Sequence, residues 1–321
     1  WWWKKLKVMP KLQGIEDKYI NGIKVDKENK DVFFNDETHK YYDKKTMQPY
    51  ISVTQIVGKY SQEFDENFWS SYKALEAILE GDVFSIIKPL LLATKRFDNR
   101  LLSKYNIDEK VFQEKKNEIL LEYKTKRDEA CEHGTNEHLK KELSFYNRSN
   151  FDFHKYGFDE AGEFECRENY YTLDLENGVY PEFLIAINYK GLRLSGQVDL
   201  MIKRGNNICI CDWKTNREIK KVSYYDKNKK SNVMMKYPLN NLMDVNYWHY
   251  AMQLSTYAFM CQQINPDFKI EKLNIVHIDR DGKETIYPIE YKKQEVERML
   301  NHYIKHQKIQ AELDEDKPIE I

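Results

Sequence analysis

Residues 194–217 constrain the fold more than any other segment of the chain. Their sequence, L-S-G-Q-V-D-L-M-I-K-R-G-N-N-I-C-I-C-D-W-K-T-N-R, contains two alternating apolar runs on either side of Gly205-Asn206, a favourable pair for a two-residue hairpin turn. A hairpin centred on that pair places Asp199 directly across from Asp212, with their Cβ atoms roughly 5 Å apart. Lys214 lies two residues beyond Asp212, so its side chain leaves the same face of the ribbon.

The opposite face of this ribbon is apolar, with Val198 expected against Trp213. Two carboxylates side by side on an otherwise buried ribbon repel each other and lose hydration. One interpretation is a buried salt-bridge cluster in which Lys214 neutralises both. The other is a Mg²⁺ site of oxygen ligands, with Lys214 directed at a water or phosphate, which is the chemistry of phosphodiester hydrolysis.

Five motifs in one order along the chain carry a resemblance to a known family. They are Gly134-Thr135-Asn136-Glu137-His138, Pro181-Glu182, Gly196-Gln197-Val198-Asp199, Cys211-Asp212-Trp213-Lys214-Thr215 and Gln253-Leu254-Ser255-Thr256-Tyr257. They resemble the G-T-x-x-H, the acidic residue before the first core strand, the G-x-x-D, the D-[aromatic]-K-T and the Q-x-x-x-Y of the PD-(D/E)xK nuclease superfamily, in its RecB-like exonuclease branch. The resemblance covers about residues 130–290. Nearer the N-terminus, the combination of His39-Lys40-Tyr41 with Ser52-Val53-Thr54 looks like the N-terminal part of phage exonucleases and of the mitochondrial genome-maintenance exonuclease.

The resemblance implies an α/β fold: a restriction-endonuclease-like mixed β-sheet core flanked by helices, with an N-terminal helical elaboration. It also implies a metal centre and a catalytic set. The expected metal ligands are His138, Asp199, Asp212, the Trp213 carbonyl and, as a further ligand, Glu182. The expected catalytic residues are Asp199, Asp212, Lys214, Gln253 and Tyr257. His133 stays open as a rival to His138, and Glu182 is alternatively an exposed residue at the start of a strand.

Within this set, Lys214 is expected to orient the attacking water or to stabilise charge at the phosphorus. Residues 244–261 are typical of a helix, which places His249, Gln253 and Tyr257 on one face, where the last two would position the DNA or Lys214.

A basic segment follows Lys214 and extends to Lys236, with Glu218 and Asp226 as its acidic residues and two tyrosines among its lysines. Solvated lysines are the ordinary meaning of such a run. Beside a catalytic strand, the pattern favours contact with phosphates. The candidate DNA-binding residues are Lys220, Lys221, Lys227, Lys229 and Lys230.

The chain is expected to comprise three segments. Residues 1–57 form an N-terminal segment with a β-hairpin, after which Ser52-Val53-Thr54 caps a helix. Residues 58–145 are helical, with a break at Pro89, and a long charged helix over residues 108–130 is either a solvated outer face or an arch beside the site. Residues 146–321 form the nuclease core, with a hairpin around Asp281-Gly282 and a C-terminal helix.

Composition bounds the partners and the setting. The net charge of −1 excludes a globally basic nucleic-acid binder, so contact with DNA must rest on local patches. No apolar run approaches the ~18–20 residues of a membrane span, and no signal-peptide pattern is present. The five cysteines suit reduced thiols in the cytoplasm. Because none follows Cys261, the iron–sulfur cluster that some relatives carry is expected to be absent.

Together these features predict an intracellular deoxyribonuclease, of a kind found in phages, that depends on Mg²⁺ or Mn²⁺. An exonuclease acting on single-stranded or end-bearing duplex DNA is favoured over an endonuclease of the same superfamily. The other alternative is a non-catalytic nucleic-acid-binding or virion-assembly protein that keeps the fold. The intact Asp199, Asp212 and Lys214 weigh against a non-catalytic role, and the sequence indicates no protein partner.

Overall fold

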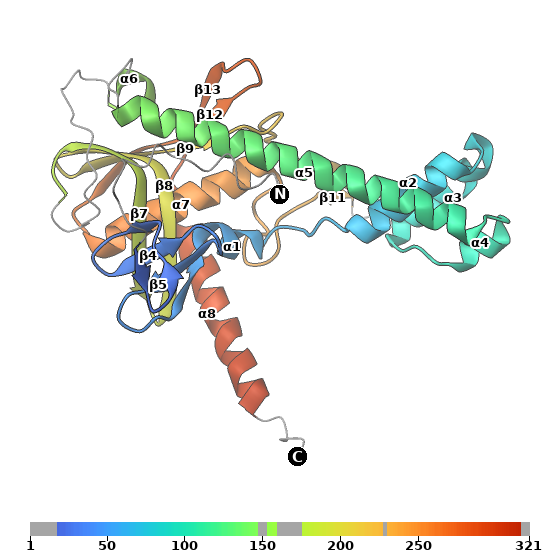
Figure 1. The fold of residues 1–321 in the computed structure, drawn as a ribbon, viewed down its shortest axis with the longest axis horizontal. Helices are drawn as coiled ribbons and strands as arrows, with labels where there is room; N and C mark the ends of the chain where they lie inside the picture. The colour runs from blue at the N-terminus through green and yellow to red at the C-terminus, as the bar shows by residue number, and fades with distance from the viewer. Residues whose placement is uncertain (1–17, 147–152, 159–174, 227–229, 316–321) are drawn as a thin grey trace.

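The computed structural model describes residues 18–146, 153–158, 175–226 and 230–315, and Figure 1 shows their arrangement. The strands are β1 (Tyr19–Ile20), β2 (Ile23–Lys24), β3 (Lys27–Glu28), β4 (Val32–Asn35), β5 (Lys40–Asp43), β6 (Pro49–Ser52), β7 (Gly178–Tyr189), β8 (Leu192–Arg204), β9 (Asn207–Lys214), β10 (Tyr225–Asp226), β11 (Ser231–Asn232), β12 (Lys269–Ile278) and β13 (Glu284–Ile289). The helices are α1 (Val53–Gly58), α2 (Glu66–Ile78), α3 (Gly81–Thr94), α4 (Arg100–Lys104), α5 (Glu109–Tyr146), α6 (Phe153–Tyr156), α7 (Asn246–Ile264) and α8 (Lys293–Glu315).

One mixed sheet forms the core, in the order β13-β12-β9-β8-β6-β5-β4-β3, with β7 also paired to β8. β8 is antiparallel to β7 from Leu192 to Lys203 on one edge. Its other edge is shared, first by β6 in parallel and then by β9 in antiparallel pairing. β12 continues the sheet parallel to β9. This mixed sheet flanked by helices confirms the expected α/β, restriction-endonuclease-like fold class.

The predicted hairpin is confirmed, and its turn lies at Gly205-Asn206, where Gly205 takes a positive φ of 57°. The expected register holds as far as Leu200 opposite Cys211. The expectation that Val198 packs against Trp213 was wrong, because the two side chains lie in separate apolar clusters.

The reason is that the side chains of β7 and β8 change faces of the sheet at the level of Glu182. Side chains three residues apart share a cluster in each strand: Tyr180 with Phe183, and Val198 with Met201. A regular strand would put such pairs on opposite faces. Between them, Glu182 has a φ of 50°, in the left-handed region that a regular strand does not visit.

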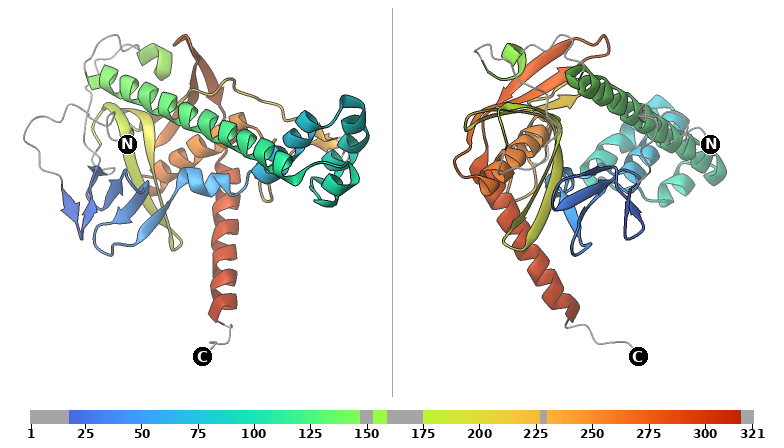
Figure 2. Two further views of the ribbon diagram at one scale, coloured as in Figure 1. Left: turned by 45° about the vertical axis from the view of Figure 1, so that its right-hand side comes forward. Right: turned by 60° about the vertical axis from the view of Figure 1, so that its left-hand side comes forward.

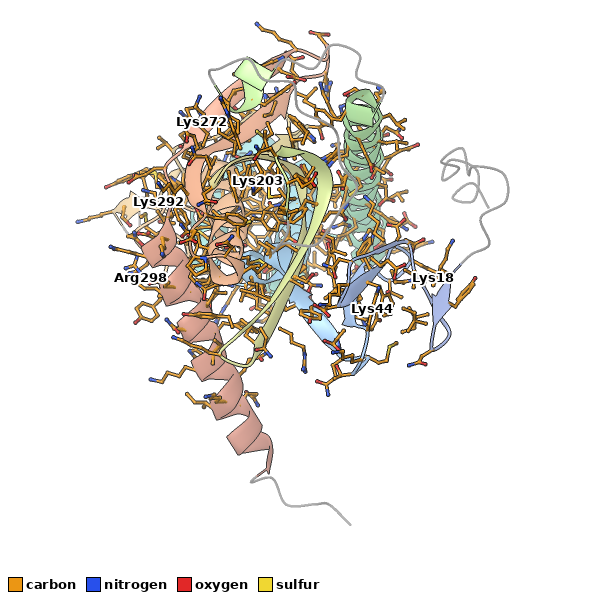
Figure 3. The ribbon with its side chains drawn as sticks, turned by 90° about the vertical axis from the view of Figure 1, so that its left-hand side faces the viewer. Lys18, Lys44, Lys203, Lys272, Lys292 and Arg298 are labelled. Atoms are coloured by element: carbon orange, nitrogen blue, oxygen red, sulfur yellow. The ribbon has the colours of Figure 1, made fainter. Side chains whose placement is uncertain are left out.

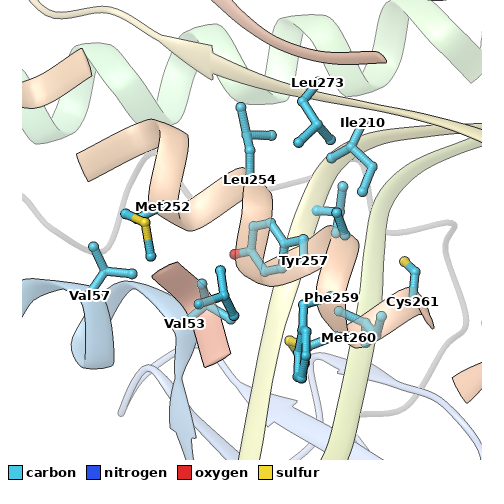
Figure 4. Close-up of a cluster of buried hydrophobic side chains, with 14 of the residues drawn as sticks. Val53, Val57, Ile210, Met252, Leu254, Tyr257, Phe259, Met260, Cys261 and Leu273 are labelled. Atoms are coloured by element: carbon cyan, nitrogen blue, oxygen red, sulfur yellow. The ribbon is translucent and has the colours of Figure 1, made fainter. Parts of the chain in front are cut away.

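Helices cover both faces of the sheet (Figure 2). On one face, α7 packs with α1 and α8 against β7–β9 and β12, and Figure 4 shows Tyr257 and Leu254 of α7 among the buried side chains there. On the other face, the end of α5 and α6 cover Trp213 and the buried cysteines of β9. The sequence-based helix over residues 244–261, the hairpin around Asp281-Gly282 and the C-terminal helix are all present as α7, β12–β13 and α8.

The N-terminal strands form a meander that curls back over β7. The expected hairpin is β4–β5, and Ser52 caps α1 in a capping box with Gln55. Val32, Phe34 and Tyr41 bury the outer face of Leu184, and the Asn29 side chain donates to the Leu184 carbonyl at 3.4 Å. β3 is the outermost strand of this meander in the sheet order, and it therefore lies against β7, the strand that carries Glu182.

The helical region has an apolar cluster of its own, made by α2–α4 and the first half of α5. The expected break at Pro89 was wrong: α3 runs through it, because Phe84, Ile87 and Leu91 remain buried in that cluster. The long helix does not end at residue 130 but continues to Tyr146, where its last turns join the core (Figure 1). The three-segment division stays a prediction. In the described part of the chain, no helix combines the length and apolar character that a membrane span needs.

Candidate active site

The site forms where β8 exchanges one neighbour for another. Of the described strands, none pairs with this edge of β8 over residues 196–199, between the last contact with β6 and the first with β9. Asp199 occupies this gap, and its Oδ2 accepts a hydrogen bond from the Trp213 backbone N–H at 2.7 Å. The Asp199 carboxylate thus accepts the N–H that a backbone carbonyl of β8 would accept if the two strands stayed paired. This hydrogen bond holds the carboxylate against the end of β9.

Three potential ligands converge on this point: His138 from α5, Glu182 from β7 and Asp199 from β8. Their ligand atoms all lie within 4.8 Å of one another. His138 Nδ1 is 3.6 Å from Asp199 Oδ1 and 3.9 Å from Glu182 Oε1. The other ring nitrogen, Nε2, is 3.2 Å from the Trp213 carbonyl oxygen. His138, and not its rival His133, is the histidine that reaches the acidic residues.

Asp212 points from β9 toward a second group of side chains. Lys214 Nζ lies 2.5 Å from its Oδ2, and the Gln253 amide of α7 donates to its Oδ1 at 3.0 Å. Asp212 Oδ2 is buried, and the ammonium of Lys214 is both its hydrogen-bond partner and its counter-charge. The Tyr250 ring lies under that ammonium, with its centroid 4.8 Å away.

The electrostatics follow from burying several charges together. Burial raises the pKa of Asp199 well above its usual range, and the nearby charge of Asp212 adds to this effect. The charge of Asp199, helped by Glu182, raises the pKa of His138 to about 9 against the opposing effect of burial. Burial acts to lower the pKa of Lys214, but Asp212 and Asp199 outweigh it and raise that pKa. Without a cation, the imidazole of His138 therefore keeps its proton at neutral pH.

A glycine explains how closely α7 can approach β8. A Cβ on Gly196 would lie 2.6 Å from Cε1 of Tyr257, so only glycine lets the tyrosine ring lie on β8. A Cβ on Gly134 would lie 3.4 Å from the Thr215 hydroxyl, an ordinary contact, which places α5 directly over the end of β9. Gly196 and Tyr257 are thus a packing pair that sets α7 against the sheet, whereas Gly134 leaves room for a methyl group where α5 passes the end of β9.

The candidate DNA-binding lysines are placed less uniformly. Lys220 and Lys221 line an open cavity of about 1160 Å³, together with Asn216, Arg217 and His249. Lys230 is exposed beyond it. Lys227 and Lys229 lie outside the described residues.

Sequence reasoning missed three side chains that contact the site. Tyr250 carried a signal, because it is one helical turn before Gln253 on α7. Gln197, which donates to Glu182, sits inside one of the motifs, yet its side chain was assigned no role. Lys27 of β3, 3.4 Å from Glu182 Oε2, had no local signal at all.

His249 lies on the helix face that it was expected to share with Gln253, but it does not reach the site. Its Nε2 is 2.5 Å from Oδ1 of Asp244, just before α7. The other oxygen of that carboxylate accepts from the Gln62 backbone N–H at 2.8 Å. The pair therefore ties the start of α7 to the segment that precedes α2.

The residues present fit a divalent cation. The donor set consists of the carboxylates of Glu182 and Asp199 with Nδ1 of His138, while the Trp213 carbonyl lies at the other ring nitrogen, Nε2. Carboxylate and carbonyl oxygens suit Mg²⁺ and Mn²⁺, and imidazole is accepted by Mn²⁺ and heavier ions. Asp212, whose buried Oδ2 is paired with Lys214, adds a further candidate donor.

Comparisons with known proteins give one family model and several solved structures. The model of the PD-(D/E)XK nuclease superfamily matches residues 92–319. No curated protein matches the chain. Among solved structures, the chain is similar to SSO0001, with 23% sequence identity and a TM-score of 0.23. The match covers 40% of this chain and 50% of SSO0001, so this chain spans half the length of that protein. It is also similar to a candidate exonuclease from Eubacterium rectale at 13% identity and a TM-score of 0.29, covering 75% and 82%.

Proposed function

The chain belongs to the PD-(D/E)XK nuclease superfamily, and from this premise we propose that it is a metal-dependent deoxyribonuclease that removes nucleotides from free DNA ends. The observation that carries the proposal is the pairing of two adjacent groups. One is the ligand cluster of His138, Glu182 and Asp199; the other is Lys214, held on Asp212 at the end of β9. The assignment to the RecB-like branch is part of the proposal and rests on the order of the five motifs.

In this proposal, His138, Glu182, Asp199, Asp212 and the Trp213 carbonyl hold Mg²⁺ or Mn²⁺. The bound cation supplies Lewis-acid polarisation of the phosphate and a template for in-line attack. Side chains of the protein supply the remaining catalytic roles.

Lys214 is the residue proposed to act on the reacting atoms. Its side chain is only 16% exposed and is fixed between Asp212 and the Tyr250 ring. An ammonium group held in that way orients the attacking water and stabilises negative charge that develops at the phosphorus. Gln253 positions Asp212 and, through it, Lys214, while Tyr257 seats the helix that carries Gln253.

The preference for free ends is proposed from the surroundings of the site. Lys220 and Lys221 line the cavity that begins just beyond Lys214, where Asn216 contacts the Tyr250 hydroxyl. Basic side chains with tyrosines nearby hold a single strand by its phosphates and bases. The helical region α2–α5 projects from the core beside this part of the chain (Figure 1).

A cleavage assay with end-labelled single- and double-stranded DNA tests the activity. We expect turnover with Mg²⁺ or Mn²⁺, little with Ca²⁺, whose looser coordination positions water poorly, and none in EDTA. The purified protein is expected to be colourless, without iron–sulfur absorption. Undiminished cleavage in EDTA, or no cleavage with any of the metals, contradicts the proposal.

Covalently closed single-stranded circles test the requirement for an end. If strands enter by an end, circles resist cleavage while linear strands of the same sequence are degraded. Equal rates on both substrates would make the protein an endonuclease of the same superfamily. Cleavage of RNA in preference to DNA would correct the substrate class.

A further inference from the structure

Lys27 reaches the cation centre from a part of the chain that lies outside the family match at residues 92–319. It is separated from Glu182 by 155 residues in the sequence, yet its Nζ lies 3.4 Å from Glu182 Oε2. The same Nζ is 3.8 Å from Glu142 Oε1 on α5. The side chain keeps 24% of its surface exposed, so it is not sealed off from solvent.

The direction of this side chain is set by the strand that carries it. Glu28, the next residue of β3, is held at 2.5 Å by both Lys18 and Lys44, two side chains labelled on the meander in Figure 3. Successive strand residues point to opposite faces, so anchoring Glu28 on one face directs Lys27 to the other, toward Glu182. The strands of the meander thus set the position of Lys27, and its contact with Glu182 follows from the fold.

The charge of the centre shows what Lys27 contributes. The charged groups that meet here are the carboxylates of Glu142, Glu182, Asp199 and Asp212 and the ammonium groups of Lys27 and Lys214. With His138 neutral, as a metal-binding imidazole must be, the net charge is two negative units, which one divalent cation balances. Without Lys27, the same groups would carry three negative units, more than one divalent cation neutralises.

We propose that Lys27 takes the electrostatic place of a second cation. It neutralises Glu182, so that the centre holds one divalent ion, and its ammonium contacts a phosphate of the nucleic-acid substrate. The N-terminal meander is then part of the active site. This inference rests on the proposed function.

The test compares the wild-type chain with Lys27→Met for two ligands measured separately. Mn²⁺ alone is titrated by calorimetry, and a short single-stranded DNA is titrated in Ca²⁺ by fluorescence anisotropy. Removing a positive charge next to the cation should tighten Mn²⁺ binding roughly five-fold. The same change should weaken DNA binding by about as much and make its dependence on log salt less steep by about 0.7, the loss of one phosphate contact.

Opposite shifts for the two ligands are the signature, because damage to the fold weakens both. Lys27→Arg, which keeps the charge, should behave as wild type. Lys30→Met, at an exposed lysine two residues after β3, is the matched control and should change neither ligand. The inference fails if Lys27→Met weakens both ligands, or changes neither while the wild type binds both. If the wild type binds neither Mn²⁺ nor DNA, the proposed function fails with it.

Discussion

Replacing Gly196 with alanine tests the packing that seats α7 on the sheet. The added Cβ would lie 2.6 Å from Cε1, 3.0 Å from the hydroxyl oxygen and 3.2 Å from Cζ of Tyr257. Tyr257 is only 3% exposed, so its ring cannot swing away from the new methyl group. The strand or the helix must shift, and we expect a loss of about 3 kcal/mol in the free energy of unfolding, the upper end of the usual cost of overpacking.

A double-mutant cycle separates this contact from other effects of the substitution. Tyr257→Leu removes the three ring atoms that clash, so adding Gly196→Ala to it should cost less than about 1 kcal/mol. Urea unfolding followed by tryptophan fluorescence gives the four free energies. Gly58→Ala is the control, because no atom lies within 4 Å of the position that its Cβ would take.

Activity should follow stability in this series. Gln253, one helical turn before Tyr257, donates to Asp212, so a displaced α7 loosens the carboxylate that holds Lys214. Cleavage by Gly196→Ala should fall and should partly return in the double variant. The reasoning is refuted if Gly196→Ala unfolds within about 0.5 kcal/mol of wild type, or if it costs the same in both backgrounds.

Three further predictions concern the site. Asp199→Ala, Asp212→Ala and Lys214→Ala should each lower single-turnover cleavage by at least ~100-fold, and a near-wild-type rate for any of them contradicts its role. Gly134→Ala should keep activity and gain up to about 1 kcal/mol in urea unfolding, because alanine favours the helix and its Cβ meets only an ordinary contact. Without divalent cations, His138 stabilises the fold below pH 6.5, and this contribution is lost as the pH rises through its folded pKa of about 9. The difference in unfolding free energy between wild type and His138→Gln, measured in EDTA, should therefore become smaller as the pH rises from 6.5 to about 9. A difference that does not change with pH argues against the contact with Asp199.

Much of the sheet could be predicted because its signals are local. The alternation around Gly205-Asn206 gave the hairpin register, and the two-residue spacing gave the contact between Asp212 and Lys214. The reversal of faces could not be predicted. It depends on a positive φ at Glu182, and a glutamate gives no sign of that conformation.

The contacts that complete the site come from tertiary structure. The motifs named Gly196 and Tyr257 separately, but only the fold shows that the absent side chain of one makes room for the ring of the other. Lys27 illustrates the limit of sequence reasoning: a lysine in a two-residue strand has no pattern that points to a glutamate 155 residues away.

The position of His138 is set by the core and not by the helical region at the far end of α5. One turn after it, Lys141 pairs with Glu284 of β13, which also accepts from the Tyr156 hydroxyl at 2.5 Å. Phe145 then stacks on the Trp213 ring, with the centroids 5.9 Å apart. Because the carbonyl of that same tryptophan faces His138, a single residue of β9 fixes both the helix and the ligand it carries. Sequence changes in α2–α4 are therefore expected to leave the cluster of His138, Glu182 and Asp199 in place.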